Sequence, residues 1–234
     1  MSPKLFTRRR FLALTGIALG SCALSCAGIG VLLNKPAPAA SGLLTGSPDL
    51  TFGDGPSKKR VLVAYATGTG STGGVAEAIG VTLAQSEEGG ASFAVDVRPV
   101  QSVTSLDDYS AVILGSAING GKWLPEAVQF LQTNQARLNQ IPTAFFLVAL
   151  MVNMKGEGNR KMVDSFLANE RAVVKPVTEG RFVGAMYAKN YPGFQGLGMR
   201  IFIAYCGLGI KGGDFRDPAA IRAWARSLRP LLKL

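Results

Sequence analysis

Short apolar runs alternate with helical segments along residues 60–232, and this alternation is the strongest constraint on the fold. The runs that predict strands lie at about 60–66, 93–100, 111–117, 141–150 and 180–189. The segments with helical spacing or helix-start signals lie at 73–85, 124–138, 159–173 and 217–232. Strands that alternate with helices favour a parallel sheet covered on both faces. We therefore predict an α/β fold with a doubly wound, five-stranded parallel sheet and helices on both of its faces.

Three loops directly follow predicted strands. Their sequences are TGTGST at 67–72, NGGKW at 119–123 and MVNMKGEGN at 151–159. Ligands of doubly wound sheets bind beyond the carboxyl ends of the strands. We therefore expect the three loops to meet at one edge of the sheet.

The loop at 67–72 has the chemistry of an anion-binding site. It lies between a strand and a helix, so backbone amides, hydroxyls and the positive end of the helix can face one ligand. Triphosphate-binding loops add a lysine, yet no lysine occurs between residues 61 and 121, and the dinucleotide glycine fingerprint is absent too. A single phosphate monoester held by neutral donors fits best. The alternative is a glycine-rich turn without a ligand.

The same segment resembles the flavodoxin signature. The matching residues are Tyr65, Thr67, Gly70, Thr72, Ala76 and Ile79. In that family the loop holds the phosphate of flavin mononucleotide (FMN), so the resemblance implies a flavodoxin-like fold with FMN as cofactor. Residues 58–234 are most similar to the flavodoxin-like menaquinone-dependent protoporphyrinogen dehydrogenases, which implies an oxidoreductase that exchanges electrons with a quinone or a small donor.

The resemblance also implies which residues hold the cofactor, while it leaves any catalytic residue unknown. The expected FMN-binding residues are Thr67, Gly68, Thr69, Gly70, Ser71, Thr72, Ala117, Asn119, Gly120, Gly121 and Trp123. Trp123 could stack on the flavin ring or instead anchor the helix that begins at Leu124. Lys122 or Lys155 could stabilise a reduced flavin or attract a carboxylate, or could simply be solvated.

Residues 1–39 resemble a twin-arginine export signal. Arg8 and Arg9 precede Phe11 and Leu12, and an uncharged stretch follows as far as Leu33. An ordinary secretory signal or an anchor helix is the alternative, and cleavage near Ala39, lipidation or retention all stay open. In each case the folded part lies outside the cytoplasmic membrane, and the twin-arginine export machinery would be a partner.

Residues 40–57, rich in Gly, Pro and Ser, predict a flexible linker before a domain at 58–234.

Composition excludes several kinds of chemistry. The chain has no histidine, and Cys206 is its one cysteine beyond the leader, so histidine-based nucleophile pairs and cysteine metal clusters are excluded and no metal site is predicted. Five of the 25 basic residues and none of the 15 acidic ones lie in the leader, which leaves +5 for the rest. The absence of a lysine-rich run argues against nucleic-acid binding. The mild positive charge instead suits an anionic lipid or substrate.

The two resemblances together imply an exported FMN-dependent oxidoreductase as the first hypothesis, and the composition is compatible with it. The alternatives are a non-enzymatic electron carrier and a scaffold that keeps only the fold.

Residues 199–208, MRIFIAYCGL, are apolar apart from Arg200. They predict either a buried helix or one that covers the flavin and lets a quinone approach from the lipid. In both cases Cys206 is expected to be an inert, buried thiol.

Overall fold

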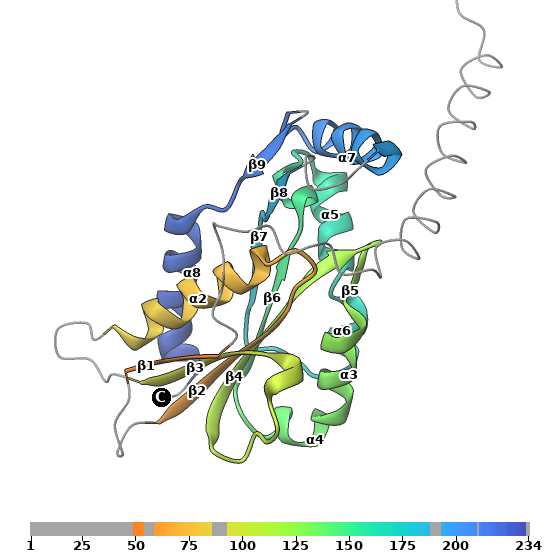
Figure 1. Ribbon diagram of the computed structural model, residues 1–234. Coiled ribbons are helices and arrows are strands. Elements are labelled where there is room, and N and C mark those ends of the chain that lie inside the picture. The colour runs from red at the N-terminus through yellow and green to blue at the C-terminus, as the bar shows by residue number, and fades with distance from the viewer. Residues whose placement is uncertain (1–48, 54–58, 86–92, 188–192, 210, 233–234) are drawn as a thin grey trace, which may run out of the picture. The chain divides into compact units, whose positions relative to one another are not determined.

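The computed structural model describes residues 49–53, 59–85, 93–187, 193–209 and 211–232 (Figure 1). The predicted export signal at 1–39, its cleavage position and most of the predicted linker lie outside these ranges. Within them, no helix combines the length and the apolar character that a membrane span needs.

Parallel strands form the centre of the fold. They are β2 (Arg60–Ala66), β3 (Ala94–Pro99), β4 (Tyr109–Asn119), β6 (Thr143–Val148) and β7 (Glu179–Phe182). Their order across the sheet is β3-β2-β4-β6-β7, and each neighbouring pair is parallel. The first of them, β2, lies inside the sheet, so the winding direction reverses between β2 and β4, at the switch point where such folds bind ligands. The predicted α/β fold is confirmed.

An antiparallel edge strand, β1 (Leu50–Phe52), pairs with β3. The sequence predicted a flexible linker over 40–57, and residues 50–52 correct that prediction. Leu50 and Phe52 are separated by one polar residue and pack against the core from the same side of the strand, which is the period of a half-buried strand. The sheet therefore begins before residue 58.

Helices cover both faces of the sheet (Figure 1). One face carries α2 (Ser71–Ala84) and α8 (Pro218–Leu231), and the other carries α3 (Pro125–Thr133), α4 (Gln135–Leu138), α5 (Glu157–Ser165) and α6 (Ala168–Val173). Each of the helices predicted over 124–138 and 159–173 is therefore broken into two. The cap predicted for the last helix is confirmed, because Asp217 accepts hydrogen bonds from the backbone nitrogens of Ala219 and Ala220 at 2.9 and 3.0 Å.

The strand predicted over 180–189 is interrupted after Phe182. Phe182 is the last residue of β7 to pair with β6, which itself ends at Val148. Beyond this point the chain forms β8 (Ala185–Tyr187), which pairs antiparallel with β9 (Gly212–Asp214) in a separate sheet. Helix α7 (Gly193–Tyr205) belongs to the connection between β8 and β9. Short 3₁₀ turns at Val100–Ser102 and Leu150–Asn153 follow β3 and β6.

A buried carboxylate ties β1 to the sheet. Asp96, 2% exposed, accepts hydrogen bonds from Thr51 at 2.6 Å, Arg60 at 2.7 Å and Tyr109 at 2.8 Å. Burial alone would raise the pKa of Asp96, but these hydrogen bonds and the charge of Arg60 hold it below its ordinary value. Burial, together with the bond to Asp96, raises the pKa of Tyr109 to about 12.

Replacing this carboxylate should change how stability depends on pH. A depressed folded-state pKa stabilises the fold above the ordinary carboxyl pKa, and the contribution is lost as pH falls through the folded value. We expect Asp96→Asn to cost about 1–3 kcal/mol at neutral pH. The difference from wild type should shrink towards acid, as measured by urea unfolding at several pH values. Asp108→Asn, at an exposed position, is the control; an Asp96→Asn cost that does not vary with pH would contradict the assignment.

Candidate functional site

The carboxyl ends of four neighbouring strands lie level with one another. Ala66 of β2 is opposite Ser116 of β4, and Val148 of β6 is opposite both Ala117 and Phe182. The loops predicted at 67–72, 119–123 and 151–159 therefore all leave the sheet at this edge.

The loop at 67–70 is shaped by a glycine and a threonine. Gly70 has φ +90° at the start of α2, and its backbone nitrogen donates to Thr67 Oγ1 at 2.9 Å. The first helical hydrogen bond follows, from Gly74 N to Gly70 O at 3.3 Å. Helix α2 therefore begins at Ser71, two residues earlier than predicted. Gly68 and Thr69 lie exposed at the rim of the loop.

Donors for an anion remain free at the start of α2. Gly70 provides no side-chain cap, so the first-turn amides of this helix lack that partner. Thr72 is fully buried, and its Oγ1 has no hydrogen-bond partner among the described residues. A buried hydroxyl without a partner costs about 1–3 kcal/mol. A bound anion at this helix end would satisfy the hydroxyl and the amides together, so the residues present fit a phosphate group.

The segment after β4 is a hairpin and not an open loop. Strand β4 continues to Asn119, then turns through Gly120 and Gly121 into β5 (Lys122–Trp123). Both glycines have positive φ, 58° and 79°, as a two-residue type I′ turn requires. Asn119 and Gly120 are exposed, while Ala117 and Gly121 are half-buried. Their predicted contacts with a flavin stay predictions.

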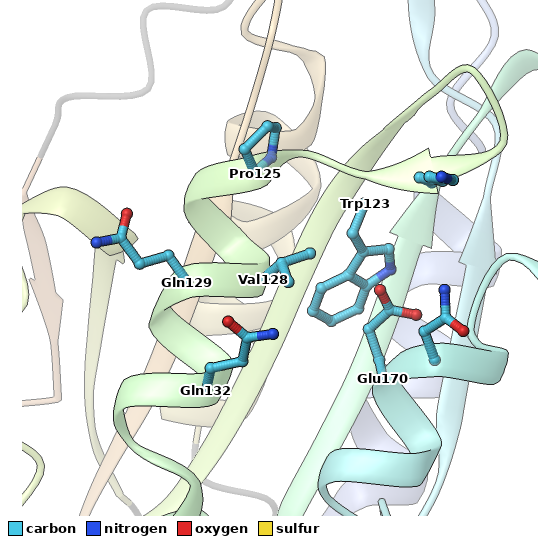
Figure 2. Close-up of a pocket in the computed structure, with 8 residues that line it drawn as sticks. Trp123, Pro125, Val128, Gln129, Gln132 and Glu170 are labelled. Carbon is cyan, nitrogen blue, oxygen red and sulfur yellow. The ribbon is translucent and has the colours of Figure 1, made fainter.

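The Trp123 side chain is buried beneath this hairpin (Figure 2). Its ring meets Phe145 edge-on, with centroids 5.2 Å apart. It also lines a cavity of about 510 Å³ between α3 and α6, into which Glu170 of α6 points (Figure 2). Burial raises the pKa of Glu170 above its ordinary value. This packing is the arrangement expected of a helix anchor, and stacking on a flavin stays a prediction.

Two residues that sequence analysis did not select help to fix these loops. Ser116 Oγ accepts from the backbone nitrogen of Leu124 at 2.9 Å, which holds the return of the hairpin into α3. Gly184 lies so near the start of α2 that a Cβ there would be 2.9 Å from Ser71 Oγ. A glycine inside the predicted strand over 180–189 is the signal that could have marked this close approach.

Comparison with known families identifies the family to which the chain belongs. The family model of the flavodoxin domain matches residues 62–204, more than half of the chain. The chain belongs to the flavodoxin domain family. The match spans both the loop between β2 and α2 and most of α7.

Similar solved structures include two flavodoxins and one larger protein. A flavodoxin from the domain Archaea is 18% identical, with 73% of this chain and 99% of that chain covered and a TM-score of 0.40. Flavodoxin 1 from Bacillus cereus is 14% identical, with 64% and 95% covered and a TM-score of 0.39. A metal-soaked flavodiiron core from Synechocystis is 14% identical, with 75% and only 37% covered and a TM-score of 0.40. A search of curated proteins found no significant match to the chain.

The remaining candidate residues of this flavodoxin domain, Lys122, Lys155 and Tyr65, lie in ordinary environments for their residue types. Lys122 and Lys155 are both exposed. Tyr65 is 5% exposed, and its ring lies so close to Gly73 that a Cβ there would meet it at 3.1 Å. Burial, aided by Asp49 and Glu77, raises the pKa of Tyr65. Over the described ranges, no three His, Cys, Asp or Glu side chains gather in a way that could hold a metal ion.

The turn at Gly70 offers a direct test of the loop of this flavodoxin domain. Alanine at φ +90° is strained, so we expect Gly70→Ala to lower the free energy of unfolding by about 1–2 kcal/mol. Gly68→Ala is the matched control, because a Cβ at Gly68 meets nothing within 4 Å and its φ is not positive. Urea unfolding of both variants measures the difference. Equal effects at the two positions would contradict the loop conformation.

Proposed function

We propose that this flavodoxin domain binds FMN through its phosphate at residues 67–72. The observation that carries the proposal is the buried Thr72 hydroxyl, which has no hydrogen-bond partner among the described residues, at the start of α2, where Gly70 provides no side-chain cap. A phosphate dianion gains from the positive helix end without needing a lysine. The flavin ring of FMN would then lie beyond the carboxyl ends of the strands, on the side of the hairpin at Asn119–Trp123.

Each part of the chain has a separate task in this proposal. The Thr67, Thr69, Ser71 and Thr72 hydroxyls would donate to the phosphate, with Thr67 held in place by the hydrogen bond from Gly70 N. The rigid type I′ hairpin would present Ala117, Asn119, Gly120 and Gly121 to the ring. FMN supplies one- and two-electron redox chemistry when bound. Exposed Lys122 would favour a negative charge beside the hairpin.

We further propose that the chain is an exported oxidoreductase, similar to the protoporphyrinogen dehydrogenases, that exchanges electrons with a quinone or a small donor. The twin-arginine pattern of the leader supports export, and the sequence resemblance over 58–234 supports the reaction class. The net charge of +5 outside the leader suits an anionic partner or a carboxylate-bearing substrate.

The experiment is to purify the full chain and record its visible spectrum. We expect the absorption bands of oxidised flavin, with FMN itself released on denaturation and identified by chromatography. Bleaching of those bands by menaquinol would support the quinone reaction. A colourless protein that takes up no added FMN would overturn the cofactor assignment, and a flavin that no quinol reduces would overturn only the partner.

A further inference from the structure

The outward side of α7 carries an unusual group of apolar side chains. Its members, here called the α7 outer face, are Leu197, Ile201, Phe202 and Tyr205, which are 55%, 65%, 38% and 66% exposed. Among the described residues, the other strongly exposed large apolar side chains are Val177, in the connection between α6 and β7, and Leu231, at the end of α8. Contiguous apolar surface of this kind marks an interaction site.

The spacing of these residues makes one continuous stripe. At about 100° per residue, Leu197, Ile201, Tyr205 and Phe202 fall within an arc of about 140°. The opposite side of the helix is the buried one, with Ile203 and Cys206 packed against Leu150. The helix is therefore apolar on both sides, and only one side is covered by described residues.

Contacts with the rest of the domain fix which side faces outward. Asn153, in the turn after β6, donates to the Cys206 carbonyl at 2.9 Å just beyond the end of α7. Ile203 and Cys206 are 0% and 1% exposed, so rotating α7 to hide its outer face would expose them instead. The α7 outer face is thus held outward. Helix α7 lies at the end of the fold where the carboxyl ends of the central strands lie (Figure 1).

The charge of the chain segment that contains α7 favours one kind of occupant for this face. No acidic residue occurs between Glu179 and Asp214, whereas Arg200 and Lys211 are basic and exposed. A second copy of the chain would bring like charges together, which disfavours self-association through this face. An anionic bilayer attracts these cations, and apolar and aromatic side chains such as Phe202 and Tyr205 suit the boundary between headgroups and acyl chains.

We propose that the α7 outer face docks on the surface of a bilayer that contains anionic phospholipid. Leu197, Ile201, Phe202 and Tyr205 enter the interfacial layer, and Arg200 contacts lipid phosphates. The α7 helix lies on the membrane and does not span it. This docking is independent of FMN binding and of the leader, because it rests on the folded domain alone.

Tryptophan reporters in the full chain test the docking position by position. Ile201→Trp places a reporter on the outer face, and Val177→Trp, 43% exposed in the parent, is the control elsewhere. Each variant is mixed with vesicles of brominated phosphatidylcholine, with or without phosphatidylglycerol, and the emission of the unsubstituted chain is subtracted. We expect a blue shift and strong quenching at position 201 only, dependent on phosphatidylglycerol and weakened by salt.

A second pair of variants tests the charge. Adding Arg200→Glu to Ile201→Trp should weaken vesicle binding about fivefold or more. Arg222→Glu, an exposed arginine of α8, is the matched control and should have little effect. Equal quenching at 177 and 201 would mean that the leader alone tethers the chain, and no quenching at 201 would mean that residues 1–48 cover the face. A lipid-free dimer abolished by Ile201→Glu would assign the face to a second copy; each of these results overturns the proposal.

Discussion

Thr72→Val will weaken FMN binding by about 10- to 100-fold and leave the free protein at least as stable as before. A hydrogen bond to a charged group contributes about 1.5–3 kcal/mol, and each 1.4 kcal/mol is a factor of ten in affinity. Valine keeps the shape of threonine, so the change removes the hydroxyl and little else. Because no described residue is a hydrogen-bond partner for this buried hydroxyl, its removal should also relieve a desolvation cost when FMN is absent.

The opposite signs of the two effects make this prediction specific. Apoprotein is titrated with FMN while flavin fluorescence is followed, and urea unfolding is measured without FMN. The matched control is Thr82→Val in the same helix: Thr82 is also buried, but its Oγ1 donates to Ala78 O at 2.7 Å. We expect Thr82→Val to cost stability and to leave FMN affinity unchanged. Unaltered affinity in Thr72→Val would remove the central support for the phosphate site.

The sequence determines the central strands and the loop between β2 and α2 because the signals for both are local. Strands β4 and β6 are continuous apolar runs, and α8 carries its own cap at Asp217. The loop between β2 and α2 is equally local, since Thr67, Gly70 and Thr72 lie within six residues of one another. Periodicity and turn chemistry therefore predict both the fold class and the position of the candidate site.

Tertiary contacts decide the parts that sequence reasoning missed. Strand β1 exists because Leu50 and Phe52 can pack on the core and Thr51 can reach Asp96, which lies 45 residues away. The burial of Trp123 depends on how α3 and α6 flank it, and its sequence neighbourhood alone leaves two roles open. The contact of Gly184 with Ser71 joins segments more than 100 residues apart. Such long-range packing overrides local propensity.

Gly115→Ala should produce the largest loss of stability among the single substitutions considered. Gly115 lies in β4, and a Cβ there would be 2.0–2.4 Å from the ring atoms of Phe146. That ring is fully buried and is backed by Phe182 and Trp224, with ring centroids 6.3 and 6.4 Å away, so it has little room to retreat. Overpacking costs about 1–3 kcal/mol and sometimes more. We expect about 3 kcal/mol, a large fraction of a typical domain's 5–15 kcal/mol.

A control and a rescue separate the clash from the general effect of adding a methyl group. Gly158→Ala in α5 meets nothing within 4 Å and should stabilise by about 0.5–1 kcal/mol, because glycine is a poor helix former. Phe146→Leu alone should cost about 1 kcal/mol, yet it should recover part of the stability lost in Gly115→Ala, because the smaller side chain makes room for the methyl group. Urea unfolding of the wild type, Gly115→Ala, Phe146→Leu and the double variant gives the coupling energy between the two positions. We expect it to be about 1–3 kcal/mol in the favourable direction. Strict additivity would show that the ring is not the obstacle and that the backbone of β4 sets the requirement for glycine.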